Sequence, residues 1–191
     1  LFPGRRRVRH PPGSGPSLWG FQGHGMRFRL AWPLGQKYVS GMADSAREIE
    51  NLLYRYAELI DGGDLPGVAQ LFAHGCIKPG HDPSPEAEAR GEAAVLQMYQ
   101  AATRLYPDGT PRTRHLTTNA LIEVEDGADT ASARSYFTVV QQTDVLPLQP
   151  IISGRYHDTF QRIEGRWCFD TRIMWVDLVG NLKEHLLYEL P

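Results

Sequence analysis

The chain has 191 residues, of which 41% are hydrophobic and 22% are charged, a size and composition typical of one globular domain. No apolar run approaches the roughly 18 residues of a membrane-spanning helix, so we expect no integral membrane protein. Two cysteines, Cys76 and Cys168, exclude a disulfide scaffold. His74, His81 and Asp82 straddle a proline-rich loop without a fourth ligand, and phosphate-loop and dinucleotide motifs are absent, so no metal or cofactor is expected.

The net charge of −2 hides an uneven distribution of charge along the chain. Residues 1–41 carry seven basic side chains and no acidic ones, whereas residues 42–191 carry 13 basic and 22 acidic side chains, a net charge of −9. The leader is rich in Gly and Pro and is predicted to be disordered. It is interpreted as a basic arm, a transit peptide, or translated upstream sequence with the true start at Met42, and we favour the third interpretation. The acidic domain argues against a nucleic-acid partner.

Helical patterns dominate the first half of residues 42–191. Ser45 and Glu48 have the spacing of a capping box, and the apolar residues that follow recur at helical intervals. Gly62 and Gly63 end this helix, because glycine adopts the left-handed exit conformation at little cost. Asp64 is then placed to cap a second, short helix. The next predicted elements are a short strand over 74–79, a loop over 79–90 and a helix over 91–106.

The second half changes to segments rich in Val, Ile, Thr and aromatic residues, separated by short turn signals. Short connections favour antiparallel neighbours, so the segments predict a meander of long antiparallel strands. Helices followed by strands indicate an α+β fold with the helices packed on one face of the sheet. The predicted strands are 113–125, 130–143, 151–163 and 166–179.

Several short motifs occur in a particular order along the domain: YAELIDGGDLPGVAQLF, a Gly-x-x-Ala helix start at 91–94, TRHLTTN, GRYHDTFQRIEGRWCF and RIMW. In this order and spacing the chain resembles the nuclear transport factor 2-like superfamily, in its SnoaL-like branch of polyketide cyclases, scytalone dehydratase, bile acid dehydratase and hexachlorocyclohexane dehydrochlorinase. The resemblance covers about residues 45–180. It implies a cone, or cystatin-like roll, in which a curved antiparallel sheet wraps around the N-terminal helices and leaves a mostly apolar pocket.

The resemblance also implies a catalytic pair. In the dehydratase and dehydrochlorinase members, an aspartate at the position of Asp61 pairs with a histidine at the position of His115. An imidazole can accept a proton near neutral pH, and a carboxylate on its other nitrogen fixes the tautomer. Tyr56 matches a tyrosine that contacts the substrate oxygen in the bile acid dehydratase. The alternatives are a helix-end aspartate, a strand histidine with satisfied hydrogen bonds, and a tyrosine that packs in the core.

Three further residues are predicted to bind substrate. The resemblance places an arginine that points into the pocket at Arg172. Strand alternation puts Met174 on the same face, and Asp170 on that face is an alternative partner for the arginine. Asn119 follows His115 by four residues and is expected on its strand face, where a local hydrogen bond is the alternative. Asp158 is interpreted as structural, holding a neighbouring backbone group or an arginine.

The predicted function is a small cofactor-independent lyase or isomerase of dehydratase type. His115 would remove a proton next to a carbonyl, Asp61 would orient it, and Tyr56 and Arg172 would stabilise the oxyanion. By resemblance alone, the substrate is a hydrophobic ring compound of steroid, polyketide or aromatic type. The alternative is a non-catalytic protein that binds a ligand or serves as a scaffold, like the β subunits of aromatic-ring dioxygenases.

A homodimer in the cytoplasm is also expected. Alternation along residues 166–179 places four large apolar side chains on the face opposite Arg172, and such a patch is unfavourable when exposed to water. These side chains are Trp167, Phe169, Ile173 and Trp175.

Overall fold

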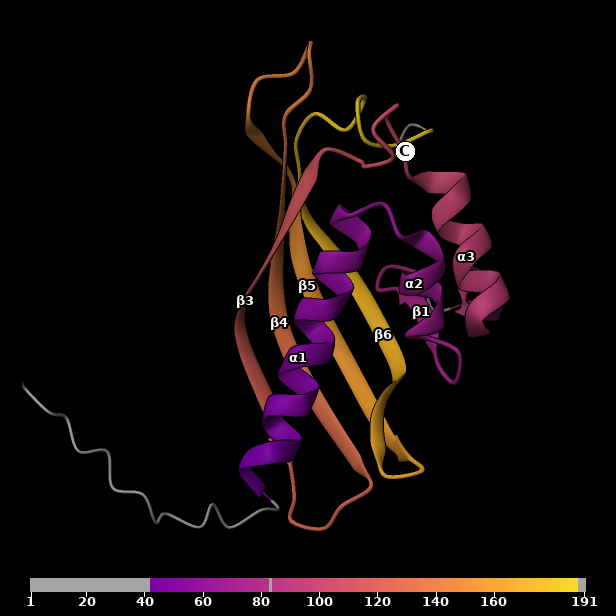
Figure 1. The fold of residues 1–191 in the computed structure, drawn as a ribbon, viewed down its shortest axis with the longest axis vertical. Coiled ribbons are helices and arrows are strands. Elements are labelled where there is room, and N and C mark those ends of the chain that lie inside the picture. Colours follow the sequence, from indigo (N-terminus) through magenta and orange to yellow (C-terminus); the bar gives the residue numbers. More distant parts are fainter. Residues whose placement is uncertain (1–41, 83, 189–191) are drawn as a thin grey trace, which may run out of the picture. The chain divides into compact units, whose positions relative to one another are not determined.

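The computed structural model describes residues 42–82 and 84–188 (Figure 1). The basic leader lies outside these residues. The elements run in chain order as helices α1 (Met42–Asp61) and α2 (Leu65–Gln70), strand β1 (Cys76–Pro79), a 3-10 turn (Pro85–Ala87), strand β2 (Ala89–Arg90), helix α3 (Gly91–Ala102), and strands β3 (Thr113–Val124), β4 (Thr130–Gln141), β5 (Gln149–Ile163) and β6 (Arg166–Val179). Among the described helices, none combines the length and the apolarity needed to cross a membrane.

The six strands form one curved sheet in the order β2-β1-β6-β5-β4-β3. The four long strands are consecutive antiparallel neighbours, as their short connections predict. The short strand β1, whose pairing was not predicted, pairs with β6 in parallel, with Ile77 opposite Arg172. The chain between these two strands includes α3 and three long strands, and this length permits the return that a parallel pair needs.

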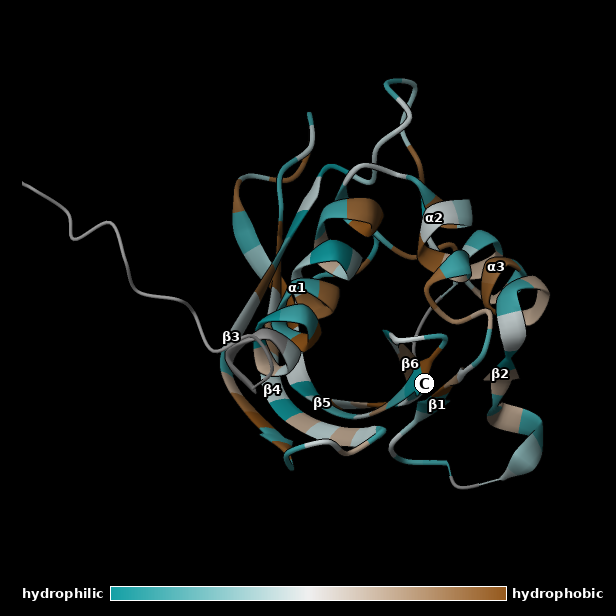
Figure 2. Ribbon diagram, turned by 60° about the horizontal axis from the view of Figure 1, so that its bottom comes forward, coloured by the Kyte–Doolittle hydropathy of each residue, from teal (hydrophilic) through white to brown (hydrophobic). Residues whose placement is uncertain are grey.

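Helix α1 lies across the inner face of the sheet, and α2 and α3 lie beside it (Figure 1). One stripe of α1 is buried, with its apolar residues turned toward the interior (Figure 2). This arrangement confirms the predicted α+β cone, in which a curved sheet encloses the N-terminal helix. The core-facing side chains of α1 are Ile49, Leu53, Tyr56 and Ile60.

The helix ends agree with the sequence patterns in part. Asp64 caps α2 and accepts a hydrogen bond from the Gly67 amide at 2.9 Å, as predicted. The predicted capping box is wrong, because α1 already begins at Met42 and Ser45 lies within it. The buried Ser45 hydroxyl accepts a hydrogen bond from Arg162 Nη2 at 2.9 Å instead. At Gly63, φ is +76° and a Cβ would lie 1.9 Å from a backbone oxygen, so only glycine fits.

Helix α3 ends at Ala102, four residues before the predicted end. Thr103 leaves the helix to form a bridge with Leu186, and the Arg104 amide donates to the His185 carbonyl at 2.8 Å. These partners come from the end of the chain, so local helical periodicity carries no information about them. Tertiary pairing overrides helix propensity here.

A β-bulge in β6 changes which side chains face the interior. In β6 the register moves from Thr171 to Phe169, so Asp170 is an extra residue. Trp167 and Phe169 therefore lie in the core, 4% and 0% exposed, on the same side as Arg172. The predicted assignment of these residues to opposite faces is wrong, and the predicted four-residue apolar patch is divided. Strict period-two alternation fails wherever a strand carries one unpaired residue.

Candidate active site

The end of α1 and the start of β3 meet at a buried carboxylate. Asp61 Oδ1 lies 2.7 Å from His115 Nδ1 and accepts a hydrogen bond from Thr113 Oγ1 at 2.8 Å. Asp61 Oδ2 accepts one from the His115 amide at 2.8 Å. The side chains of His115 and Asp61 are only 8% and 11% exposed. The predicted contact between the carboxylate and the imidazole is therefore present, and three donors surround the carboxylate.

These donors decide the charge of Asp61. Burial by itself would raise the pKa of Asp61, but the hydrogen bonds and positive charge of His115, with the hydroxyl of Thr113, outweigh burial and hold the pKa below its ordinary value. Asp61 is thus ionised at neutral pH and can only accept hydrogen bonds. We infer that Nδ1 of His115 carries the ring proton, which leaves Nε2 as an unprotonated acceptor.

Tyr56 lies next to His115 inside the sheet, as predicted. Its ring is 3% exposed and meets the imidazole edge to face, with the ring centroids 6.2 Å apart. The Tyr56 hydroxyl is 2.7 Å from the hydroxyl of Tyr99 on α3. Burial, and then the neighbouring Tyr56, raise the pKa of Tyr99 well above its ordinary value. Tyr99 therefore stays neutral and can donate to Tyr56, which frees the Tyr56 hydroxyl to donate elsewhere.

Arg172 is fully buried and forms a two-point ion pair with Asp158, at 2.9 and 2.8 Å. Its guanidinium lies over the rings of Tyr56 at 4.3 Å and Tyr156 at 4.0 Å. Burial disfavours the charge, but Asp158 outweighs burial and raises the pKa of Arg172. Asp158 thus holds an arginine, as interpreted from the sequence, whereas Asp170 accepts from Thr159 Oγ1 instead. The arginine points inward, with its guanidinium over the ring of Tyr56.

The two remaining predicted binding residues lie in different places. Met174 is partly buried and packs against the core, next to Tyr156 across the β5–β6 pair. Asn119 is exposed and has φ of +54° at a bulge in β3. It lines a shallow hollow of about 280 Å³ with residues such as Tyr136. The expectation that Asn119 shares the face of His115 is wrong, because the bulge reverses the alternation between them.

An open groove of about 730 Å³ reaches the site from the side of Asp61. Asp61 and Thr113 contribute to its lining together with charged residues such as Arg112 and apolar ones such as Val140 and Leu148. Its lining does not include His115. The carboxylate of the pair is thus reached from the groove, while the imidazole faces the interior near Tyr56.

Sequence reasoning missed Thr113 and Tyr99 at the site, and it missed the buried His185 beside the end of α3. Thr113 stands two positions before His115, so strand alternation could have placed its hydroxyl on the same face. Tyr99 lies within the helix predicted over 91–106, and no local signal pairs it with Tyr56. His185 comes from the end of the chain, with its ring buried.

A family model described as the SnoaL-like domain matches residues 42–173. The chain belongs to the SnoaL-like family, within the nuclear transport factor 2-like superfamily. The matched range of this SnoaL-like protein contains Asp61, His115 and Arg172, and ends before His185. No functionally curated protein matches the sequence significantly.

Several solved structures resemble this SnoaL-like protein. A protein of unknown function with a cystatin-like fold from Nostoc punctiforme PCC 73102 is 26% identical, with a TM-score of 0.59 over 74% of this chain and 97% of that one. A proposed scytalone dehydratase from Novosphingobium aromaticivorans is 21% identical, with a TM-score of 0.57 over 78% and 94%. A nuclear transport factor 2-like protein from the same organism is 22% identical, with a TM-score of 0.55 over 74% and 92%. These similarities show the fold.

Proposed function

We propose that this SnoaL-like protein is a lyase or isomerase of dehydratase type that uses His115 as its base and needs no cofactor. The 2.7 Å contact between His115 Nδ1 and Asp61 Oδ1 carries the proposal, because it leaves Nε2 free to accept a proton. The substrate class is a hydrophobic ring compound with a carbonyl group. The family resemblance supports that class, as does the aromatic interior around Tyr56.

The proposed reaction removes water from a β-hydroxy ketone. His115 Nε2 accepts the proton next to the carbonyl, and the electrons of the broken C–H bond form an enolate. Asp61 stabilises the resulting imidazolium, and the Tyr56 hydroxyl donates to the enolate oxygen. The enolate electrons then form the C=C bond and expel the β-hydroxyl, which takes the proton from the imidazolium and leaves as water.

Arg172 supports this reaction without contacting the substrate. Its charge lies 4.3 Å from the centre of the Tyr56 ring and is neutralised by Asp158. A buried cation beside a phenol favours negative charge near that phenol, so it strengthens the hydrogen bond that Tyr56 donates. Arg172 is therefore a positioning residue in this proposal.

A screen of cyclic β-hydroxy ketones, followed through the absorbance of the conjugated product, tests the proposed activity. We expect His115→Gln to lose about 10³-fold in kcat/KM, because a general base contributes an effect of that size. His74→Gln is the matched control, since His74 is exposed and lies outside the site. Turnover that survives His115→Gln would overturn the proposed function.

The alternative function is a scaffold without catalysis. The low exposure of His115 and the complete burial of the Arg172–Asp158 pair favour it, because both are also what a stable core requires. A scaffold would copurify with a larger partner, and its screen would show no turnover in either the original protein or the His115 variant. Either result with a purified, folded protein would favour this alternative over the lyase.

We also propose a homodimer through the outer face of the sheet, although not through the predicted patch. Leu121 on β3 and Tyr136 on β4 line the same outer hollow and are 59% and 50% exposed. We expect Tyr136→Ala to shift the protein from dimer to monomer, because truncation of a large aromatic side chain at the centre of an interface removes much of its binding free energy. Sedimentation velocity at micromolar concentration measures the shift, and an original protein that sediments as a monomer would refute the dimer.

A further inference from the structure

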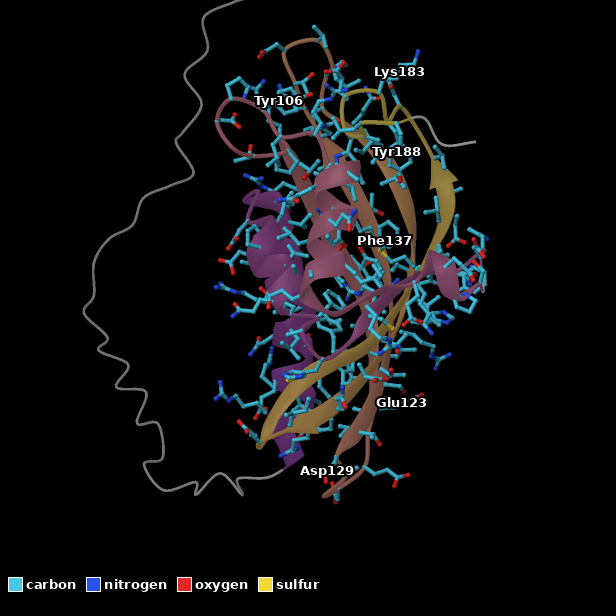
Figure 3. All side chains as sticks on the ribbon, turned by 90° about the vertical axis from the view of Figure 1, so that its right-hand side faces the viewer. Tyr106, Glu123, Asp129, Phe137, Lys183 and Tyr188 are labelled. Atoms are coloured by element: carbon cyan, nitrogen blue, oxygen red, sulfur yellow. The ribbon has the colours of Figure 1, made fainter. Side chains whose placement is uncertain are left out.

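The segment after β6 places a second histidine, His185, beside the end of α3. Figure 3 shows Tyr106 and Lys183 at one end of the sheet, opposite Asp129. His185 lies at the same end of the sheet as Tyr106, and it is only 9% exposed. Its Nδ1 atom is buried and makes no hydrogen bond with any residue in 42–82 or 84–188. A buried polar atom without a partner is energetically unfavourable, so the atom calls for a ligand or solvent partner.

Backbone hydrogen bonds fix the position of His185 firmly. Its amide donates to the Leu182 carbonyl at 2.9 Å, and its carbonyl accepts from the Arg104 amide at 2.8 Å. Leu186 pairs with Thr103 in a β-bridge. The segment is thus attached to the end of α3 on both sides of His185. A ring held on an attached backbone is positioned before any ligand binds, which lowers the entropic cost of binding.

A continuous set of contacts joins His185 to the catalytic pair. Asp61 accepts from Thr113, and Thr113 is paired with Gln141 across β3 and β4. The amide of the fully buried Gln141 donates to the carbonyl of Glu184, the residue before His185, at 3.1 Å. Gln141 Oε1 is a second buried atom without a hydrogen bond among the described residues. Two unpartnered polar atoms therefore lie at the end of this chain of contacts.

We propose that His185 contacts the substrate, donating a hydrogen bond from Nδ1 to an oxygen of the bound ring compound. This inference rests on the proposed function, since it adds a residue to the same site. The class of ligand is a ring compound that carries a hydroxyl or carbonyl oxygen. A hydroxyl would suit the site well, because it can accept from an imidazole and donate to an amide oxygen such as Gln141 Oε1.

The charge of His185 fits this role. Burial, and then the positive charge of His115, lower the pKa of His185 to about 4, against an opposing effect of Asp61. His185 is therefore neutral while His115 gains and loses a proton. A neutral imidazole can polarise a substrate oxygen without placing a second cation beside an imidazolium. The two histidines thus differ in role because their surroundings differ.

The first test concerns proximity and uses imidazole nitrogen NMR on the intact protein. His115→Phe removes the positive neighbour and leaves Asp61, so we expect the pKa of His185 to rise by about one pH unit. His157→Phe is the control, because His157 lies on β5 next to the outer hollow. An unchanged pKa of His185 in the His115 variant would overturn the inference that the two histidines share one site.

The second test concerns ligand contact and uses 2-naphthol as a fluorescent ring hydroxyl. We expect His185→Phe to weaken its binding about tenfold, as loss of one hydrogen bond of about 1.4 kcal/mol implies, while His185→Gln stays within about threefold. Binding that His185→Phe leaves unchanged, or no binding to the original protein, overturns the proposal. Neither result bears on the proposed lyase, which is tested separately by turnover of the original protein and by its loss in His115→Gln.

Discussion

Replacement of Asp158 by Asn is expected to lower the free energy of unfolding by about 3–5 kcal/mol, because it leaves a buried charge without its partner. Asp158 accepts two hydrogen bonds from Arg172, and both side chains are fully buried. An amide keeps the shape but removes the negative charge, so the guanidinium stays among Tyr56, Tyr156 and Phe169 without neutralisation. Urea denaturation of the two proteins measures the difference.

The chain contains a matched ion pair on its surface. Arg155 and Asp177 also form a two-point pair, with both distances at 2.8 Å, but these side chains are 40% and 35% exposed. Asp177→Asn is expected to cost less than about 1 kcal/mol, because water screens exposed charges. Equal losses in the two variants would show that burial does not increase the contribution of the Arg172–Asp158 pair to the free energy of unfolding.

The double replacement Asp158→Leu with Arg172→Met should regain most of the lost free energy of unfolding, since it removes both charges.

Much of the fold is predictable because its signals are local. The apolar stripe of α1 recurs at helical intervals, and the four long strands have turn signals between them, so both were predicted close to their observed bounds. The parallel pairing of β1 with β6 was not predictable in this way. It joins residues 76–79 to residues 171–174, and no local pattern reports on such a distant partner.

The bulges explain the errors about which side chains face inward. An extra residue at Asp170 moves Trp167 and Phe169 into the core, and the bulge near Asn119 turns that side chain outward. Period-two alternation places a residue correctly only up to the first bulge on its strand. Arg172 and Met174 lie close together after the bulge, so their shared face was predicted correctly.

The contact between Asp61 and His115 was predictable for a different reason. The family resemblance aligns Asp61 with His115, although 54 positions separate them, and the contact is present. His185 lies beyond the part of the chain that resembles the family. Its place depends on the bridge between Thr103 and Leu186, which is a tertiary contact with no sequence signal of its own.

Replacement of Asp61 by Asn is expected to lower kcat/KM by about 10³–10⁴-fold while the fold remains intact. An ionised Asp61 accepts from Nδ1 of His115 and so leaves Nε2 as the base. An amide can donate to Nδ1 instead, which favours the tautomer that has its proton on Nε2 and cannot accept another there. Asp64→Asn is the matched control, because asparagine caps a helix as well as aspartate and Asp64 lies outside the pair.

Acid unfolding gives an independent measure of the same carboxylate. The pKa of Asp61 is lowered in the folded protein, so its stabilising contribution is fully present above the ordinary value of 3.8 and is lost as the pH falls through the lowered value. Asp61→Asn lacks this contribution at every pH. The difference in free energy of unfolding between the two proteins should therefore shrink as the pH falls below 3.8. A difference that stays constant on acidification would mean that Asp61 is not held ionised by His115 and Thr113, and the base proposed for His115 would lose its support.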